Sequence, residues 1–96
     1  MSGGHFNYKQ SEILEIAKEI DHLIYVNGSS GKDAQGVALH AAYPPDVIQK
    51  FRVASRKLKK AYIYAQRIDW LVSGDDGEGS FKVRLAEDLR ELANGV

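Results

Sequence analysis

The chain has 96 residues, with 13 basic side chains, 13 acidic side chains, no cysteine and a formal net charge of zero. The composition, 44% apolar and 27% charged residues, is typical of one small soluble domain. The absence of cysteine excludes a disulfide framework, a thiolate zinc site and a cysteine nucleophile. The start of the chain has no signal-peptide core, and no apolar run approaches the roughly 18 residues that cross a bilayer. We therefore expect a single helical domain over residues 1–96, in the cytoplasm and without a membrane partner.

Residues 1–10 form a short arm that contains two aromatic side chains, Phe6 and Tyr8. We expect this arm to be extended. An arm of this length has no core of its own, so its aromatic side chains need a surface to dock on. That surface is a helix of the same chain, a partner chain or a ligand.

The first predicted helix covers residues 11–26. Its apolar side chains recur every three or four residues, which is typical of one face of an amphipathic helix: Ile13, Ile16, Ile20 and Leu23. Gln10 or Ser11 is the expected N-terminal cap, and Asn27-Gly28 is the expected left-handed exit. His22 lies two residues after Ile20, where it can reach the edge of a cleft.

A long loop is expected over residues 27–45, and connectors of this length are usually functional. Its segment Gly28-Ser29-Ser30-Gly31-Lys32 resembles a phosphate loop only superficially. The phosphate loop needs four residues between its glycines and a Ser or Thr after the lysine, whereas this chain has two residues and Asp33. A nucleotide hydrolase is therefore not expected, although a contact between the loop and an anion stays open.

The second predicted helix, residues 46–72, follows Pro44-Pro45, a pair suited to a first helical turn. Small and apolar residues recur in alternating steps of three and four, the pattern of a helix-packing seam: Phe51, Ala54, Leu58, Ala61, Ala65, Ile68 and Val72. This seam is longer than the first helix can cover. The surplus apolar length predicts burial against other copies of the chain, and hence a homo-oligomer.

The charges of the chain are segregated along its length. Residues 47–68 contain seven basic side chains and no acid, while the segments before and after them carry net charges of −3 and −4. Segregated charge favours pairing between segments, either within one chain or between copies. Binding to duplex nucleic acid is not expected, because it usually needs a net basic domain.

Residues 73–79 read as an acidic, glycine-rich linker whose spacing does not match a calcium-binding loop. A third helix is expected over residues 80–93, capped by Ser80, with one apolar face: Phe81, Leu85, Leu89 and Leu92. The predicted fold class is therefore all-α. It is an antiparallel helical hairpin with a long second helix, completed by a C-terminal helix.

The sequence contains no pattern that indicates catalysis. The three histidines have neither the spacing nor the acidic partners of a metal site, and no nucleophile with a base or carboxylate pair can be placed in one pocket. We expect a protein that is not an enzyme and that uses no cofactor and no metal.

The basic helix also carries aromatic residues. Lys60, Tyr64 and Arg67 lie along one flank of the seam, where a tyrosine can stack on a base while Lys and Arg hold phosphates. The simpler alternative, solvated charges with tyrosines at the edge of the core, stays open at this point.

Two segments, Phe6-Asn7-Tyr8-Lys9-Gln10 and Ala61-Tyr62-Ile63-Tyr64-Ala65-Gln66-Arg67-Ile68, carry a resemblance. They resemble the helical-hairpin family of small phage proteins that counter CBASS and Thoeris immunity, the anti-CBASS protein 2 type in particular. The resemblance implies an all-helical hexamer that sequesters cyclic dinucleotides between protomers without cleaving them. It also implies a separate site for cyclic trinucleotides, and a place in the cytosol of an infected bacterial host.

Carried over to this sequence, the resemblance implies that Tyr8 stacks on a base and that Arg67 contacts a phosphate. Asn27 and Lys32 are the candidate phosphate contacts of the loop. The remaining candidate ligand-binding residues are Lys9, His22, Lys60 and Tyr64. The alternative is a small nucleic-acid-associated or assembly protein that contacts phosphates or an acidic partner through its basic helix, residues 47–68.

Overall fold

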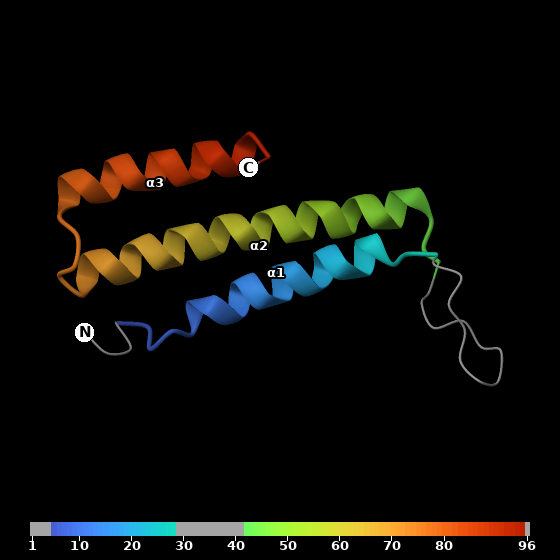
Figure 1. Cartoon of the computed structure of the whole chain (residues 1–96), viewed down its shortest axis with the longest axis horizontal. Helices are drawn as coiled ribbons and strands as arrows, with labels where there is room; N and C mark the ends of the chain where they lie inside the picture. Colours follow the sequence, from blue (N-terminus) through green and yellow to red (C-terminus); the bar gives the residue numbers. More distant parts are fainter. Residues whose placement is uncertain (1–4, 29–41, 96) are drawn as a thin grey trace.

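The computed structural model describes residues 5–28 and 42–95, which form three α-helices and no strand. These are α1 (Gln10–Tyr25), α2 (Pro45–Val72) and α3 (Glu78–Ala93). The predicted all-α class is confirmed, and the helices begin and end within two residues of the expected positions. Figure 1 shows α2 in the middle, with α1 antiparallel to it on one side and α3 antiparallel to it on the other.

The central helix, α2, has 28 residues and is therefore about 42 Å long. Pro45 occupies its first turn, after Pro44 in an extended conformation (φ −68°, ψ 161°). The helix ends where Gly74 adopts a left-handed φ of +84° and the carbonyl of Trp70 accepts two backbone N–H groups from the following turn. Within the described part of the chain, α2 packs against both α1 and α3, which do not pack against each other.

A small buried patch holds α1 against α2. Ala17 of α1 is completely buried, and Ser55 of α2 is 3% exposed. The Ser55 hydroxyl donates to Asp21 Oδ1 at 2.5 Å, and Lys59 Nζ lies 2.6 Å from Asp21 Oδ2. The small side chains of Ala17 and Ser55 leave the polar side chains room to meet across the interface.

The seam of α2 lies differently from the prediction. The buried positions of α2 are Ile48, Ser55 and Asp69. Ser55 and Asp69 are polar, so the spacing of apolar residues does not indicate that they are buried. Within the predicted seam, Ala61 is exposed, and Ile68 and Val72 are 37% and 52% exposed. The second half of the apolar seam is therefore not covered by α1 in the single chain.

Three local predictions are wrong. The arm is not extended, because residues 5–9 form turns that lead directly into α1. The N-cap residue of α1 is Lys9, and not Gln10 or Ser11, because the helix already begins at Gln10. Ser80 is not the residue before α3, since the helix begins two residues earlier, at Glu78, after Gly77. The Ser80 hydroxyl still accepts the Gly77 N–H at 3.3 Å, so it caps the first turn from inside the helix.

Polar contacts connect α3 to α2. Arg67 Nε donates to Asp88 Oδ2 at 2.6 Å, and Arg56 Nη1 donates to the carbonyl of Leu92 at 3.0 Å. No residue of α3 is buried. The segregated charges thus meet within the chain, with Lys59 on Asp21 of the first acidic segment and Arg67 on Asp88 of the last.

The three helices lie side by side in one layer, and the chain measures 56 × 29 × 17 Å along its principal axes. Among the residues described, no helix combines the length and the apolar character that a membrane crossing requires.

Candidate ligand-binding surfaces

The arm is anchored to the end of α2 by one carboxylate. Asp69 is 4% exposed, and its Oδ1 accepts the backbone N–H groups of His5 at 2.6 Å and Phe6 at 2.9 Å. Its Oδ2 accepts Gln10 Nε2 at 3.3 Å. Hydrogen bonds to an ionised acceptor are about twice as strong as neutral ones, so the anchor fixes the start of the arm.

The anchored arm continues through two left-handed residues, Asn7 (φ 55°) and Tyr8 (φ 63°). The turn is closed by the Lys9 N–H, which donates to the Phe6 carbonyl at 3.1 Å, and by Ser11 Oγ, which donates to the Tyr8 carbonyl at 2.7 Å. The Tyr8 residue itself is 61% exposed. A fixed and conformationally costly turn therefore presents an aromatic ring to the outside of the molecule.

A pocket of about 480 Å³, hereafter the arm pocket, lies between the arm and the two helices of the hairpin. Most of its lining is apolar, and it combines residues of the arm, the first turn of α1 and one side chain of α2: His5, Phe6, Asn7, Lys9, Gln10, Ile13 and Ala65. The rings of His5 and Phe6 meet edge to face at 5.2 Å. The pocket thus has aromatic and aliphatic walls next to a lysine.

A second cavity, of about 380 Å³, is lined by residues of α2, including Arg67, by residues of α3 and by Leu14 of α1; we call it the α2–α3 cavity. The Arg67 guanidinium lies over the Trp70 ring at 4.7 Å while its Nε is held by Asp88. Asp88 raises the pKa of Arg67 above its ordinary value, mainly through this hydrogen bond. Arg67 is therefore a permanent cation in a fixed position. A phosphate that binds to Arg67 must compete with the Asp88 carboxylate for the guanidinium.

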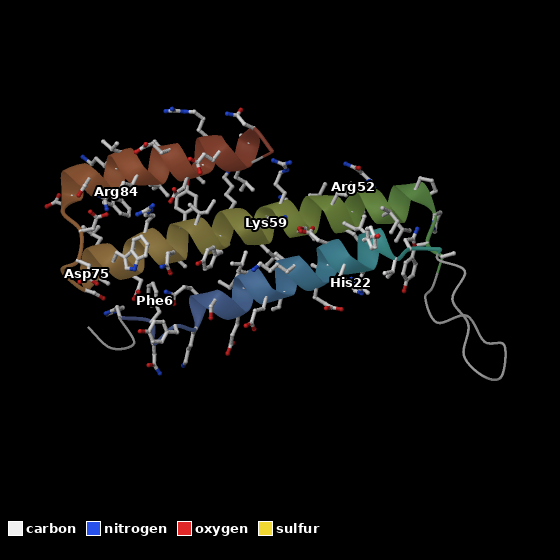
Figure 2. All side chains as sticks on the ribbon, viewed as in Figure 1. Phe6, His22, Arg52, Lys59, Asp75 and Arg84 are labelled. Atoms are coloured by element: carbon white, nitrogen blue, oxygen red, sulfur yellow. The ribbon has the colours of Figure 1, made fainter. Side chains whose placement is uncertain are left out.

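A third surface is strongly basic. Four cations of α2 gather around a shallow hollow of about 530 Å³: Arg52, Arg56, Lys57 and Lys60. Figure 2 shows Arg52 on the N-terminal half of α2, away from Arg84 of α3. We call this group the basic face.

The structure places the predicted ligand-binding residues in several regions. Tyr8 and Lys9 lie together in the arm turn. Lys60, Tyr64 and Arg67 share one flank of α2, because they follow one another at steps of four and three residues. In a single chain, Arg67 faces α3 whereas the arm lies on the α1 side.

The other candidate residues lie elsewhere. His22 is exposed on α1, about 18 Å along the helix axis from Gln10, and Figure 2 shows it at the opposite end of α1 from Phe6. The Asn27 side chain is engaged by Tyr43, whose N–H donates to Oδ1 at 2.8 Å and whose carbonyl accepts Nδ2 at 3.1 Å. Lys32 and most of the predicted loop lie outside the described residues.

Sequence reasoning did not find Asp69, Gln10 or Asp88 as organising residues. One signal was available for Asp69, since it lies 21 and 14 residues after the buried Ile48 and Ser55, a whole number of heptads. A lone acid at such a position needs buried donors. Among residues 5–28 and 42–95, no cluster of His, Asp and Glu is suited to hold a metal ion.

Comparison of the chain with models of protein families, with curated proteins and with solved structures finds no match. The function must therefore be inferred from the anchored arm, the α2–α3 cavity and the basic face themselves.

Proposed function

We propose that the protein binds a cyclic oligonucleotide non-covalently, between copies of the chain, and holds it without cleaving it. The observation that carries this proposal is the anchored arm. Its left-handed turn presents an exposed Tyr8, and the turn is held in place by the buried carboxylate of Asp69.

The arm has the properties of a ligand clamp. Consecutive left-handed residues with side chains cost free energy, and such conformations concentrate at ligand-binding sites. Because the arm is already fixed, little ordering entropy is lost when a ligand binds. A base that stacks on Tyr8 gains about 1–3 kcal/mol, and every base has a face that can stack.

The phosphates are assigned to the flank of α2. Lys60 and Arg67 supply cations on either side of Tyr64, and the guanidinium of Arg67 is pre-oriented by Trp70 and Asp88. In one chain Arg67 is held by Asp88 of α3, whereas the arm that carries Tyr8 is held by Asp69, so we assign the two contacts with one ligand to two copies of the chain. The proposed sponge is therefore a homo-oligomer, a hexamer in the form that the resemblance implies, and it acts in the cytosol of the infected cell.

Calorimetry against a panel of cyclic dinucleotides and trinucleotides tests this proposal. We expect binding to at least one member of the panel. After heat denaturation of the complex, the recovered ligand should have its original mass, because a sponge releases its ligand unchanged. No binding to any member of the panel would refute the proposed function, and a cleaved ligand would refute the sponge mechanism.

The basic face supports a second candidate function, a nucleic-acid-associated or assembly protein. The ion pairs and side-chain hydrogen bonds of the described residues leave Arg52, Lys57 and Lys60 of this face unpaired. A salt titration with duplex DNA separates the two functions. A protein that neutralises several phosphates loses affinity steeply as salt rises, whereas a sponge has little duplex affinity at physiological salt.

A further inference from the structure

Gln10, which lines the arm pocket, has a buried side-chain acceptor that no donor of the described residues reaches. Gln10 is 5% exposed, and its Nε2 donates both to Gln66 Oε1 at 2.8 Å and to Asp69 Oδ2 at 3.3 Å. These two acceptors fix the orientation of the amide. Gln10 Oε1 is then buried and has no hydrogen-bond partner among residues 5–28 and 42–95. A buried acceptor of this kind is costly until a donor reaches it.

The walls of the arm pocket select a flat group. Phe6, Ile13 and Ala65 supply apolar surface, and His5 packs edge to face on the Phe6 ring. A heteroaromatic ring can lie against such walls while its polar edge reaches Gln10. The volume of about 480 Å³ is large enough for one base with part of its sugar.

The charges around the arm pocket show which part of a nucleotide enters. Gln10 is hydrogen-bonded to the carboxylate of Asp69, so the inner end of the pocket repels a phosphate and attracts a hydrogen-bond donor. Lys9, by contrast, is an exposed residue of the lining, where it can meet a phosphate that stays outside.

From these observations we infer that the arm pocket is a base-binding site that takes an amino-bearing purine, whose exocyclic N–H donates to Gln10 Oε1. This inference rests on the proposed function and deepens it. It adds a base site under the arm to the stacking position on Tyr8. It also gives a reason to prefer ligands that contain adenine or guanine over ligands without an exocyclic amino group.

The first test changes the ligand and leaves the protein intact. The probes are cyclic di-AMP, cyclic di-GMP and their analogues without the amino group, with purine in place of adenine and hypoxanthine in place of guanine. For the dinucleotide that binds, we expect loss of the amino group to weaken binding to the wild-type protein by about tenfold or more. In Gln10→Leu, the difference between the amino ligand and its analogue should disappear.

The second test fills the pocket. Ala65→Leu adds bulk to the lining, and the matched control is Ala86→Leu, at an exposed position of α3 outside the α2 seam. We expect Ala65→Leu to weaken binding by about tenfold or more and Ala86→Leu to bind like the wild type. Circular dichroism and molar mass show whether each variant keeps its helices and its assembly.

The outcomes separate the inference from the proposed function. If the wild type binds no cyclic dinucleotide or trinucleotide of the panel, both are wrong. If it binds a member of the panel but neither of these two dinucleotides, the base-site inference is wrong and the proposed function stands. If it binds one of them equally well with and without the amino group, the base-site inference is wrong and the proposed function stands. If Ala65→Leu changes the molar mass instead of the affinity, the pocket receives a side chain of another copy, and the inference is again wrong. The comparison of ligands uses wild-type protein, so it remains decisive even if Gln10→Leu does not fold.

Discussion

Asp69 is a single residue on which the geometry of the arm depends. Its position in α2 could be predicted from the helical pattern, but its partners could not. They are backbone N–H groups 63 and 64 residues away, and a backbone donor leaves no mark in the sequence. The left-handed turn at Asn7 and Tyr8 could not be predicted from the sequence either, because neither residue is the glycine that normally indicates a positive φ.

Removal of this carboxylate should release the arm. We expect Asp69→Ala to lower the free energy of unfolding by roughly 2–3 kcal/mol, because it leaves donors of His5, Phe6 and Gln10 without their charged acceptor. Urea unfolding measures this change, and hydrogen exchange at His5 and Phe6 should accelerate. Asp75→Ala, an exposed acid six residues later, is the control and should leave both quantities unchanged.

Tyr8 should matter for binding and not for assembly. Tyr8→Ala removes an exposed ring, so we expect a loss of about 1–3 kcal/mol of affinity for the cyclic oligonucleotide with an unchanged molar mass. The control is Tyr25→Ala, which removes an 86% exposed tyrosine at the far end of α1. If Tyr8→Ala and Arg67→Ala both bind every cyclic oligonucleotide as the wild type does, Tyr8 and Arg67 are not the binding residues.

Asp21 should make the stability of the hairpin depend on pH. Lys59 and then Ser55 donate to its carboxylate and hold its pKa below the ordinary 3.8, against a smaller opposing effect of burial. Its contribution is therefore complete above about pH 4 and is lost as the pH falls through the lower pKa of the folded state.

Urea unfolding of the wild type and Asp21→Asn at about pH 7 and about pH 2 measures this contribution. The stability difference between the two proteins should be present at the higher pH and shrink at the lower one. Glu19→Gln, which removes an exposed acid of the same helix, should not change the pH dependence. A stability difference between wild type and Asp21→Asn that is equal at both pH values would contradict the role of the Lys59 pair.

The helices themselves were the most predictable level. The proline pair before α2, the glycines after α1 and α2, and the spacing of apolar residues placed all three elements almost correctly. The pairing surface of α2 was not predictable in the same way. Helices approach closely where side chains are small, so Ala17 and Ser55 decide the contact while the longer apolar stripe turns partly outward.

The helices should differ in their local stability. None of the α3 residues is buried, and polar contacts from Arg67 and Arg56 hold the helix to α2. We therefore expect amide hydrogens of α3 to exchange faster than those in the middle of α1 and α2 when exchange is followed by mass spectrometry. Asp88→Ala should widen this difference in exchange rate, because it removes the ion pair with Arg67. The control is Glu91→Ala, one turn later in α3. Glu91 forms no ion pair among the described residues, so this variant should leave the difference unchanged. Equal protection of all three helices in the wild type would contradict the expectation.

At the scale of the whole molecule, the helices of residues 5–28 and 42–95 lack the second layer that a helical domain normally has. Among the described residues, Ala17 and Ile48 are the only buried hydrophobic residues. The radius of gyration is 17.6 Å, whereas a compact chain of this length has a value of about 12.5 Å. Small domains pack two layers around one core, and a single layer of helices leaves apolar side chains such as Ile16 and Val72 half exposed. A second copy of the chain can supply the missing layer, which is the same arrangement that would bring Tyr8 and Arg67 to one ligand.

We therefore expect the protein to form an oligomer, which its molar mass in solution will show. Light scattering at micromolar concentration should give a multiple of the 10.7 kDa chain mass. Ile68→Glu places a charge in the exposed half of the α2 seam and should lower the measured mass, because an unpaired charge is costly at an apolar interface. Gln49→Glu adds the same residue to an exposed position of the same helix, outside the seam, and should leave the mass unchanged. A wild-type mass equal to one chain would remove the assembly, and with it the proposal that one ligand lies between Tyr8 of one copy and Arg67 of another.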